Sequence, residues 1–290
     1  MKQQNKAYLY AGLAVLMWST VGSAFKLTLR YISPVQMLLF ASFISMIVLF
    51  LIIVIQKKIP LLIASTRKEL VHSALNSILN PFLFYIVLFY AYDLLLTQEA
   101  MVLNFTWPVT LTILSILILK QHISWKSIIA ILISFIGIIV IATKGEITAF
   151  KFTDPGGVAL ALGSTIIWAF FWIVNIRDKR DEVVKLFLNF SFGFIYILIA
   201  SWILKLLIIP SWQAIAGSIY IGLFEMGIAY VFWLKGLQLS STTAKVSNLI
   251  FMAPFISLIL INLFVGEKIL WSTFAGLGFI TVGIVLQRKS

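Results

Sequence analysis

Residues 34–55 read PVQMLLFASFISMIVLFLIIVI, a run of 22 residues without a charged side chain. At a rise of about 1.5 Å per residue, a helix of about 20 residues crosses a bilayer core about 30 Å thick. The apolar residues of this run are continuous, whereas the strands of a membrane barrel alternate apolar and polar residues. The run therefore predicts a membrane-spanning α-helix.

Similar runs recur along the whole chain. Of its 290 residues, 61% are hydrophobic and 11% are charged, and the mean hydropathy is +1.07. That leaves too little polar surface to cover a water-soluble globule. Ten spans are predicted: Tyr8–Tyr31, Pro34–Ile55, Leu70–Ala91, Gln98–Leu119, Trp125–Thr143, Gly157–Ile176, Val184–Lys205, Trp212–Leu234, Ala244–Val265 and Leu270–Gln287. The chain is expected to be an all-α membrane protein in contact with the lipid bilayer, without room for a soluble domain.

The net charge of +12 is explained by membrane topology. Basic patches also bind nucleic acids, but here Lys and Arg gather on alternate loops, as in cytoplasmic loops of membrane proteins. One side holds sixteen: Lys2, Lys6, Lys57, Lys58, Arg67, Lys68, Lys120, Lys126, Arg177, Lys179, Arg180, Lys185, Lys235, Lys245, Arg288 and Lys289. The other holds six: Lys26, Arg30, Lys144, Lys151, Lys205 and Lys268. Both termini are therefore expected in the cytoplasm, and a nucleic-acid partner is not expected.

Two further features limit what the chain contains. The first apolar run is longer than the core of a signal peptide, about 7–15 residues, and lacks a clear cleavage site, so we expect it to be retained as a spanning helix. The chain has no cysteine, which excludes disulfides, thiolate metal sites and cysteine nucleophiles. No cofactor is expected.

The two halves of the sequence align with each other. A shift of 146 residues places Pro108 on Pro254, Trp125 on Trp271 and Gly137 on Gly283, and a shift of 150 places Trp18 on Trp168. Each half contains five predicted spans, an odd number, so the second copy enters the membrane from the opposite side. Residues 1–148 and 149–290 are thus predicted to be two inverted repeats within one membrane domain, an arrangement that binds substrate at the repeat interface.

Short motifs occur in an order typical of a known family: Trp18-Ser19-Thr20, Pro108, Trp168-Ala169, Pro254 and Gly266-Glu267. With them the chain resembles, over nearly its whole length, the ten-helix EamA-type branch of the drug/metabolite transporter superfamily. The segments EAMVLNFTWP at 99–108 and GIAYVFW at 227–233 are similar to the aromatic amino acid exporters. One departure is Lys120-Gln121, where the family often has Gly-Glu. The resemblance implies a secondary transporter that exports amino acids, large neutral or aromatic, or similar small metabolites.

Glu225 is the acid that lies near the middle of a predicted span. A charge at a helix centre costs about 2.5–3.5 kcal/mol on insertion scales. One interpretation is a neutral packing residue that donates to a nearby carbonyl. We favour the other, a cavity carboxyl that holds a substrate amine or carries a coupling proton.

Glu99 and Lys245 occupy equivalent repeat positions, each nine residues before its helix proline. Inversion sends them to opposite membrane faces, so each is expected to mark one entrance of the central cavity. Ordinary helix-end roles are the alternatives, because a negative charge suits a first turn and a lysine can extend to the membrane surface.

Prolines and asparagines within spans are the next candidates. A proline removes a backbone donor and frees a carbonyl one turn earlier, and such groups need protein or water partners inside a membrane. Pro81, Pro108 and Pro254 are therefore expected to line or hinge the cavity. Asn80 and Asn104 must find partners inside the bundle, either as cavity residues or as links between helices.

Aromatic residues complete the predicted cavity: Trp18, Trp107, Trp168, Tyr230 and Trp233. Trp125, Trp212 and Trp271 lie at span ends and are interpreted as interface anchors. Apolar walls with a few polar groups suit a small neutral or zwitterionic solute.

Other classes fit the sequence less well. The two histidines, His72 and His122, lie near helix ends and the aspartates lie in or beside loops, so no metal or paired-acid centre is predicted and an enzyme is not expected. A channel would favour rings of charge or carbonyl-loop motifs. A carrier of sugars, amines or drugs stays open, as does coupling to protons. The expected location is the plasma or inner membrane.

Overall fold

The computed structural model describes residues 3–119, 125–146, 154–240 and 248–288. These residues form helices joined by turns, and no strand occurs among them. The chain divides into two compact units, one made of Met1–Ile86 and Asp178–Leu260, the other of Val87–Arg177 and Ile261–Ser290. Each unit therefore draws on both of the sequence halves that we predict to be repeats.

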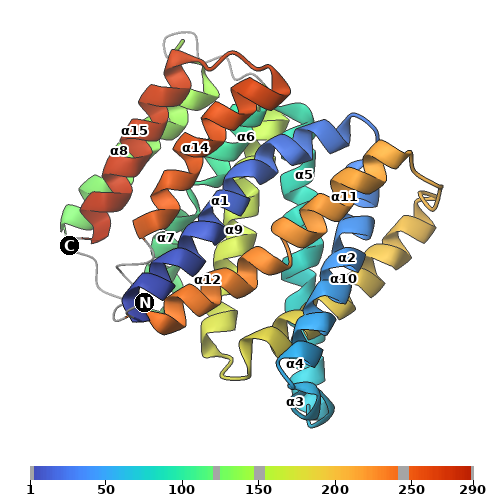
Figure 1. Ribbon diagram of the computed structural model, residues 1–290. Coiled ribbons are helices and arrows are strands. Elements are labelled where there is room, and N and C mark those ends of the chain that lie inside the picture. Colours follow the sequence, from blue (N-terminus) through green and yellow to red (C-terminus); the bar gives the residue numbers. More distant parts are fainter. Residues whose placement is uncertain (1–2, 120–124, 147–153, 241–247, 289–290) are drawn as a thin grey trace. The chain divides into compact units, whose positions relative to one another are not determined.

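The first unit contains the helices of the N-terminal third and most of those after residue 178 (Figure 1). They are α1 (Gln3–Leu29), α2 (Pro34–Ile55), α3 (Ile59–Ile63), α4 (Arg67–Ser77), the π-helical turn η1 (Ile78–Leu83), α10 (Glu182–Ile203), α11 (Trp212–Phe224), α12 (Ile228–Leu239), the 3-10 turn η3 (Asn248–Met252) and α14 (Ala253–Leu260). Helix α5 (Phe84–Leu94) begins in this unit and continues into the other.

The second unit contains the middle of the chain and its C-terminal end. Its remaining elements are α6 (Thr97–Asn104), α7 (Trp107–Leu119), α8 (Trp125–Ala142), α9 (Pro155–Arg177), the π-helical turn η4 (Ile261–Val265) and α15 (Trp271–Arg288).

The helices agree with the predicted apolar spans. Six segments are long and apolar enough to cross a membrane: Gln3–Leu29, Pro34–Ile55, Arg67–Leu94, Pro155–Asn175, Glu182–Ile203 and Trp212–Gly236. Shorter apolar helices cover Ile131–Ile141, Ala253–Val265 and Trp271–Leu286. The described residues of all ten predicted spans are helical apart from turns, end residues and the extended residue Asn80. Ten crossings and the inverted repeat stay predictions.

Helix α2, the run quoted first, shows how the sequence sets its boundary. Ser33 adopts an extended conformation, and its hydroxyl accepts a hydrogen bond from the backbone N–H of Gln36. Pro34 follows at the first helical position, where its missing N–H leaves no hydrogen bond unmade. Both features are typical of a helix start.

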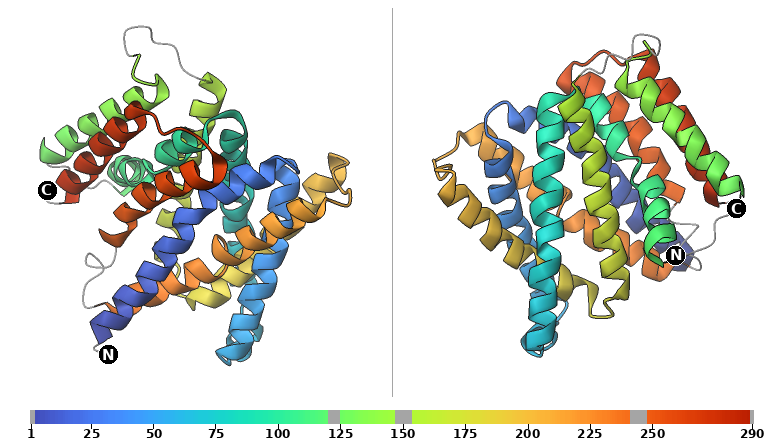
Figure 2. Two further views of the ribbon diagram at one scale, coloured as in Figure 1. Left: turned by 45° about the horizontal axis from the view of Figure 1, so that its top comes forward. Right: turned by 180° about the vertical axis from the view of Figure 1, so that it is seen from behind.

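Small residues let helices approach closely in both units. In the first unit, a Cβ added at Gly222 of α11 would lie 2.5 Å from the carbonyl oxygen of Ala41 in α2. In the second unit, Gly137 of α8 faces Gly276 of α15, and a Cβ on Gly276 would lie 2.7 Å from the Gly137 carbonyl oxygen. Figure 2 shows α8 and α15 side by side along their lengths. Such glycine contacts are typical of helix pairs in membranes.

Candidate functional site

The candidate site lies in the first unit, where a helix is interrupted at Glu225. Helix α11 ends before Glu225 and α12 begins three residues later, with a turn between them. The backbone N–H of Met226 bonds to the carbonyl of Ile221, five residues earlier, at 3.2 Å. Side chains from two other helices bind carbonyls of the turn. Trp18 of α1 donates to the Glu225 carbonyl at 3.4 Å, and Ser45 of α2 donates to the Met226 carbonyl at 2.8 Å. Side chains of the protein thus satisfy the backbone carbonyls that the interruption leaves free, as a membrane interior requires.

The Glu225 carboxyl points to a pair of tyrosines. The hydroxyl of Tyr85, at the start of α5, donates to Glu225 Oε1 at 3.1 Å. The hydroxyls of Tyr85 and Tyr230 are 3.4 Å apart, and both tyrosines are buried. The other carboxyl oxygen, Glu225 Oε2, is buried and has no hydrogen-bond partner among the described residues. One oxygen is therefore held and the other is available.

A second helix interruption, at Asn80, lies close to Tyr230. Asn80 has the extended angles φ −145° and ψ 121° inside the otherwise helical η1. Its side chain is 1% exposed and lies close to the Tyr230 hydroxyl. Neither polar atom of the Asn80 amide reaches a hydrogen-bond partner within 3.5 Å in the described part of the chain. We call Asn80, Tyr85, Glu225 and Tyr230 the carboxyl cluster.

Aromatic rings surround this cluster. The Trp18 ring meets Tyr230 edge to face with centroids 5.9 Å apart, and it lies 5.4 Å from the ring of Trp233. The rings of Phe190, in α10, and Tyr230 meet edge to face with centroids 6.4 Å apart. The structure therefore brings together five of the predicted site residues, Trp18, Asn80, Glu225, Tyr230 and Trp233.

The other predicted lining residues belong to the second unit. The amide of Asn104 donates to the Ser164 hydroxyl of α9 at 2.9 Å, which links α6 to α9. The Trp168 ring packs on Phe171 and Trp172 of its own helix, at 5.6 and 5.8 Å. Trp107 begins α7 and is partly buried. A role for Asn104, Trp107 and Trp168 in a common cavity stays a prediction.

The predicted entrances and hinges also stay predictions. Glu99 is 2% exposed, and its Oε1 lies 3.8 Å from Lys144 Nζ. Lys245 lies outside the described residues. Pro81 follows Asn80 at the interruption of η1. Pro108 is the second residue of α7, which follows a turn, and Pro254 is the second residue of α14, which directly follows the 3-10 turn η3. A missing N–H is tolerated at such a helix start.

The Gly266-Glu267 motif has a structural role that sequence reasoning did not find. Glu267 Oε1 accepts hydrogen bonds from the backbone and the hydroxyl of Thr97, at 2.8 and 2.7 Å, at the start of α6. In return, Gln98 Oε1 accepts from the Leu270 backbone at 3.0 Å and the Thr273 hydroxyl at 2.8 Å, at the start of α15. The two helix starts are thus capped reciprocally, which satisfies free N–H groups.

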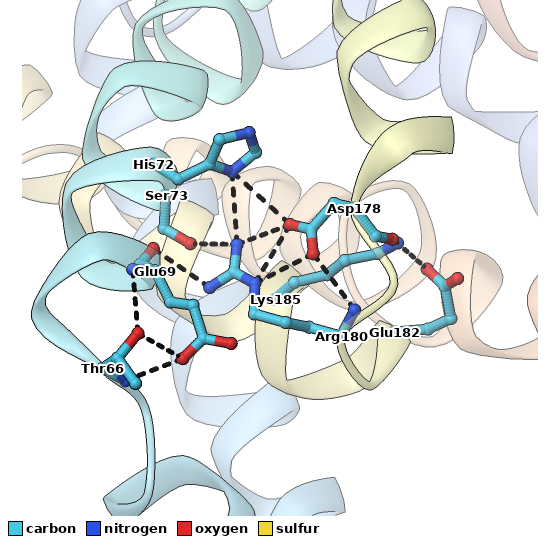
Figure 3. A network of polar contacts seen from close by, with 8 residues as sticks. All are labelled: Thr66, Glu69, His72, Ser73, Asp178, Arg180, Glu182 and Lys185. Atoms are coloured by element: carbon cyan, nitrogen blue, oxygen red, sulfur yellow. Dashed lines mark hydrogen bonds and ion pairs between the residues drawn. The ribbon is translucent and has the colours of Figure 1, made fainter.

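A second polar group that sequence reasoning missed links the α9–α10 loop to α4 in the first unit (Figure 3). Arg180 Nε donates to both carboxyl oxygens of Asp178 at 3.0 Å, and Nη2 lies 2.6 Å from Asp178 Oδ2. The same guanidinium donates to the Glu69 carbonyl at 3.1 Å and the Ser73 hydroxyl at 2.9 Å. We call Glu69, Ser73, Asp178 and Arg180 the arginine clamp.

Charge around the clamp lowers the pKa of Asp178. Burial alone would raise the pKa of this carboxyl, but the hydrogen bonds and the charge of Arg180, with a smaller contribution from Lys185, hold it below its ordinary value of 3.8. Lys185 Nζ also lies 2.7 Å from Glu182 and donates to the Asp178 carbonyl at 3.1 Å. The arrangement is a partly buried ion pair in which the Arg180 guanidinium also binds a backbone carbonyl and a hydroxyl.

Comparison with known proteins connects this architecture to a family. The model of the EamA-like transporter family matches residues 5–143 and 155–287. An uncharacterized transporter of Bacillus subtilis (strain 168), YvbV, is 27% identical over 99% of this chain and 93% of its own length. Uncharacterized transporters of Clostridium kluyveri and Archaeoglobus fulgidus are 24% and 22% identical, over 99% and 98% of this chain and 94% and 99% of their own lengths.

A solved crystal structure has the same fold, with a TM-score of 0.68 and 17% identity over 98% of both chains. The family and the three sequence relatives are described as transporters and not as enzymes. The family match covers most of the chain, and the helices include six long apolar segments. The chain belongs to the EamA-like transporter family and is a multi-pass membrane transporter.

Proposed function

We propose that the protein exports amino acids, large neutral or aromatic, by alternating access across the plasma or inner membrane. The carboxyl cluster is the observation that carries this proposal. A carboxylate and an amide are held at two helix interruptions among aromatic rings, and both keep polar atoms without partners in the described residues. Mainly apolar sites with few placed polar groups suit small zwitterions with an apolar side chain.

The two helix interruptions favour a transporter site. Transporters commonly bind substrate where spanning helices are broken near the middle of the membrane, because free backbone groups and side chains are accessible there. Glu225 and Asn80 lie at such breaks in two different spans, and Tyr85 and Tyr230 join them. The cluster is therefore proposed as part of the substrate pathway.

The proposed transport cycle uses ten crossings arranged as two inverted repeats. Its support is that the family model matches two stretches of similar length, one in each half of the chain. Sixteen of the 22 Lys and Arg residues fall on one set of predicted loops, which favours a cytoplasmic position for both termini.

The test is uptake into proteoliposomes that contain the purified protein, with a panel of radiolabelled amino acids. The proposal expects flux of aromatic or other large neutral amino acids above that of empty liposomes. Sugars, polyamines and cationic drugs form the comparison panel. Flux restricted to that panel, from protein with a cooperative thermal transition, contradicts the amino acid proposal.

Proton coupling through Glu225 is tested in the same vesicles. An imposed pH gradient is expected to drive accumulation in the native protein and not in Glu225→Gln, because the amide cannot exchange a proton. Accumulation that follows the gradient equally in both proteins contradicts a proton role for Glu225.

A further inference from the structure

The carboxyl cluster contains three buried polar atoms that make no hydrogen bond within 3.5 Å among the described residues, although the Asn80 amide lies close to the Tyr230 hydroxyl. They are Glu225 Oε2 and the two amide atoms of Asn80, Oδ1 and Nδ2. The tyrosine hydroxyls already interact with Glu225 Oε1 and with each other. The unpartnered set thus contains two acceptors and one donor.

Buried polar atoms without hydrogen bonds destabilise the folded protein unless a ligand binds to them. A buried polar group without a hydrogen bond costs about 1–3 kcal/mol, and a charged group costs more. Leucine in place of Asn80 would remove that cost, because it has a similar size and no polar atom. Other buried groups of the described residues, such as the Ser218 hydroxyl, also lack a partner, but the Asn80 amide shares one cluster with the unpartnered oxygen of Glu225. This grouping at two helix interruptions favours a common partner that binds and leaves.

The groups around these atoms favour a ligand with a positive charge. A carboxylate beside aromatic rings favours a cation, because the faces of tryptophan and tyrosine attract positive charge. The Trp18 indole N–H is engaged with the Glu225 carbonyl, which fixes the ring beside Tyr230 and Trp233. An ammonium group offers three donors for the two free acceptors.

We propose that Glu225 Oε2 and Asn80 Oδ1 bind the ammonium group of the transported amino acid, while Asn80 Nδ2 donates to its carboxylate. This inference rests on the proposed function and assigns the atoms that read the substrate head group. It makes Asn80 a specificity-determining residue, because its amide contacts both charged ends of a zwitterion. Tyr85 is a positioning residue, since its hydroxyl holds the second oxygen of Glu225.

The experiment compares three molecules that share a phenyl side chain. Radiolabelled phenylalanine is transported in proteoliposomes, with phenethylamine, which lacks the carboxylate, and 3-phenylpropionate, which lacks the ammonium group, as competitors. In the native protein, phenethylamine is expected to compete better than 3-phenylpropionate. Glu225→Gln is expected to raise the KM for phenylalanine by about tenfold or more and to remove the preference for phenethylamine.

Asn80→Leu separates binding from folding. Its KM for phenylalanine is expected to rise by about tenfold, while the Tm of the ligand-free protein stays equal or rises, because an unsatisfied amide has been removed. Ser218→Ala in α11 is the matched control, since its hydroxyl is also buried without a partner among the described residues and lies outside the carboxyl cluster. This control is expected to keep both the KM and the competitor order.

The outcomes separate this inference from the proposed function. Phenylalanine flux with unchanged KM and competitor order in folded Asn80→Leu and Glu225→Gln overturns the head-group assignment alone. Absence of any amino acid flux in the native protein overturns the proposed function and the assignment with it. Ligand-induced stabilisation provides a second readout: phenylalanine is expected to raise the Tm of the native protein and not that of Asn80→Leu.

Discussion

The Arg180 side chain connects three different groups of the first unit. Its guanidinium binds one carboxylate, one hydroxyl and one backbone carbonyl, and the side chains of Arg180 and Asp178 are only 12% and 8% exposed. A guanidinium presents its donors in a rigid planar fork that matches a carboxylate, which an ammonium group cannot reproduce. The clamp thus depends on the shape of the group as well as on its charge.

Arg180→Ala is expected to destabilise the protein by about 1–3 kcal/mol, because the partly buried Asp178 carboxylate loses its main hydrogen-bond donor while Lys185 stays nearby. Arg180→Lys is expected to recover part of this loss. Chemical denaturation in detergent micelles measures both, with Lys179→Ala as the control because that side chain is exposed. An Arg180→Ala protein as stable as the control contradicts a stabilising role for the clamp.

The lowered pKa of Asp178 predicts an acid limit on stability. A carboxyl whose pKa is lower in the folded than in the unfolded state binds fewer protons when folded, so its contribution is present above the unfolded pKa and is lost as pH falls through the folded pKa. Melting curves of the native protein are therefore expected to shift to lower temperature below about pH 4. Asp178→Asn is expected to be less stable at neutral pH and to show a smaller acid shift, and equal acid shifts contradict the assignment.

At the scale of elements, packing between α8 and α15 depends on the absence of side chains. The backbone of each helix fills the space that a Cβ of the facing glycine would occupy. The two glycines lie 139 positions apart in the sequence, so neither residue alone indicates the contact. Close approach of this kind increases van der Waals contact, which drives helix association in membranes.

Gly276→Ala is expected to destabilise the protein by about 1–3 kcal/mol, because its Cβ would meet the Gly137 carbonyl oxygen at 2.7 Å. Gly278→Ala, two residues along the same helix, has no atom within 4 Å of the added Cβ. It is expected to be neutral or to stabilise the protein by up to about 1 kcal/mol, from helix propensity. Thermal melting of the two variants checks the opposite signs, and equal losses contradict the packing argument.

The sequence predicts the helices better than it predicts the site. Continuous apolar residues mark a span because most side chains of a spanning helix face lipid or other apolar helices, and the boundaries of α2 agree with prediction. Pro81 indicated the interruption at Asn80. The turn at Glu225 contains no proline, only Gly227, and its surroundings are as hydrophobic as an unbroken helix.

Contacts between distant parts of the sequence were missed for a physical reason. Tyr85 is 140 positions from Glu225, and a tyrosine in a span fits packing or interface roles equally well. The charge count places Arg180 on a basic loop, and loop charge does not indicate its contacts with Ser73 and Asp178. Side-chain partners of this kind depend on the fold, which hydropathy and charge counts do not specify.

At the scale of the whole molecule, the absence of cysteine makes topology directly testable. A single introduced cysteine is the one thiol of this chain that can react, because the sequence contains no other, so labelling is read on the purified protein. In whole cells, Lys205→Cys is expected to react with an impermeant maleimide, because it lies on the predicted outer face. Lys179→Cys is expected to react only after permeabilisation, and labelling of both in intact cells contradicts the predicted orientation.

The reciprocal cap formed by Glu267 and Gln98 has a consequence for how relatives are compared. The Glu267 carboxylate caps the start of α6, and the Gln98 amide caps the start of α15. The Gly-Glu pair therefore links two helices of the second unit. This link between helices does not depend on which solute is transported. We expect relatives that have this Gly-Glu pair to share the local helix arrangement, and we expect differences in cargo to follow the residues at the positions of Asn80 and Glu225, the proposed head-group residues.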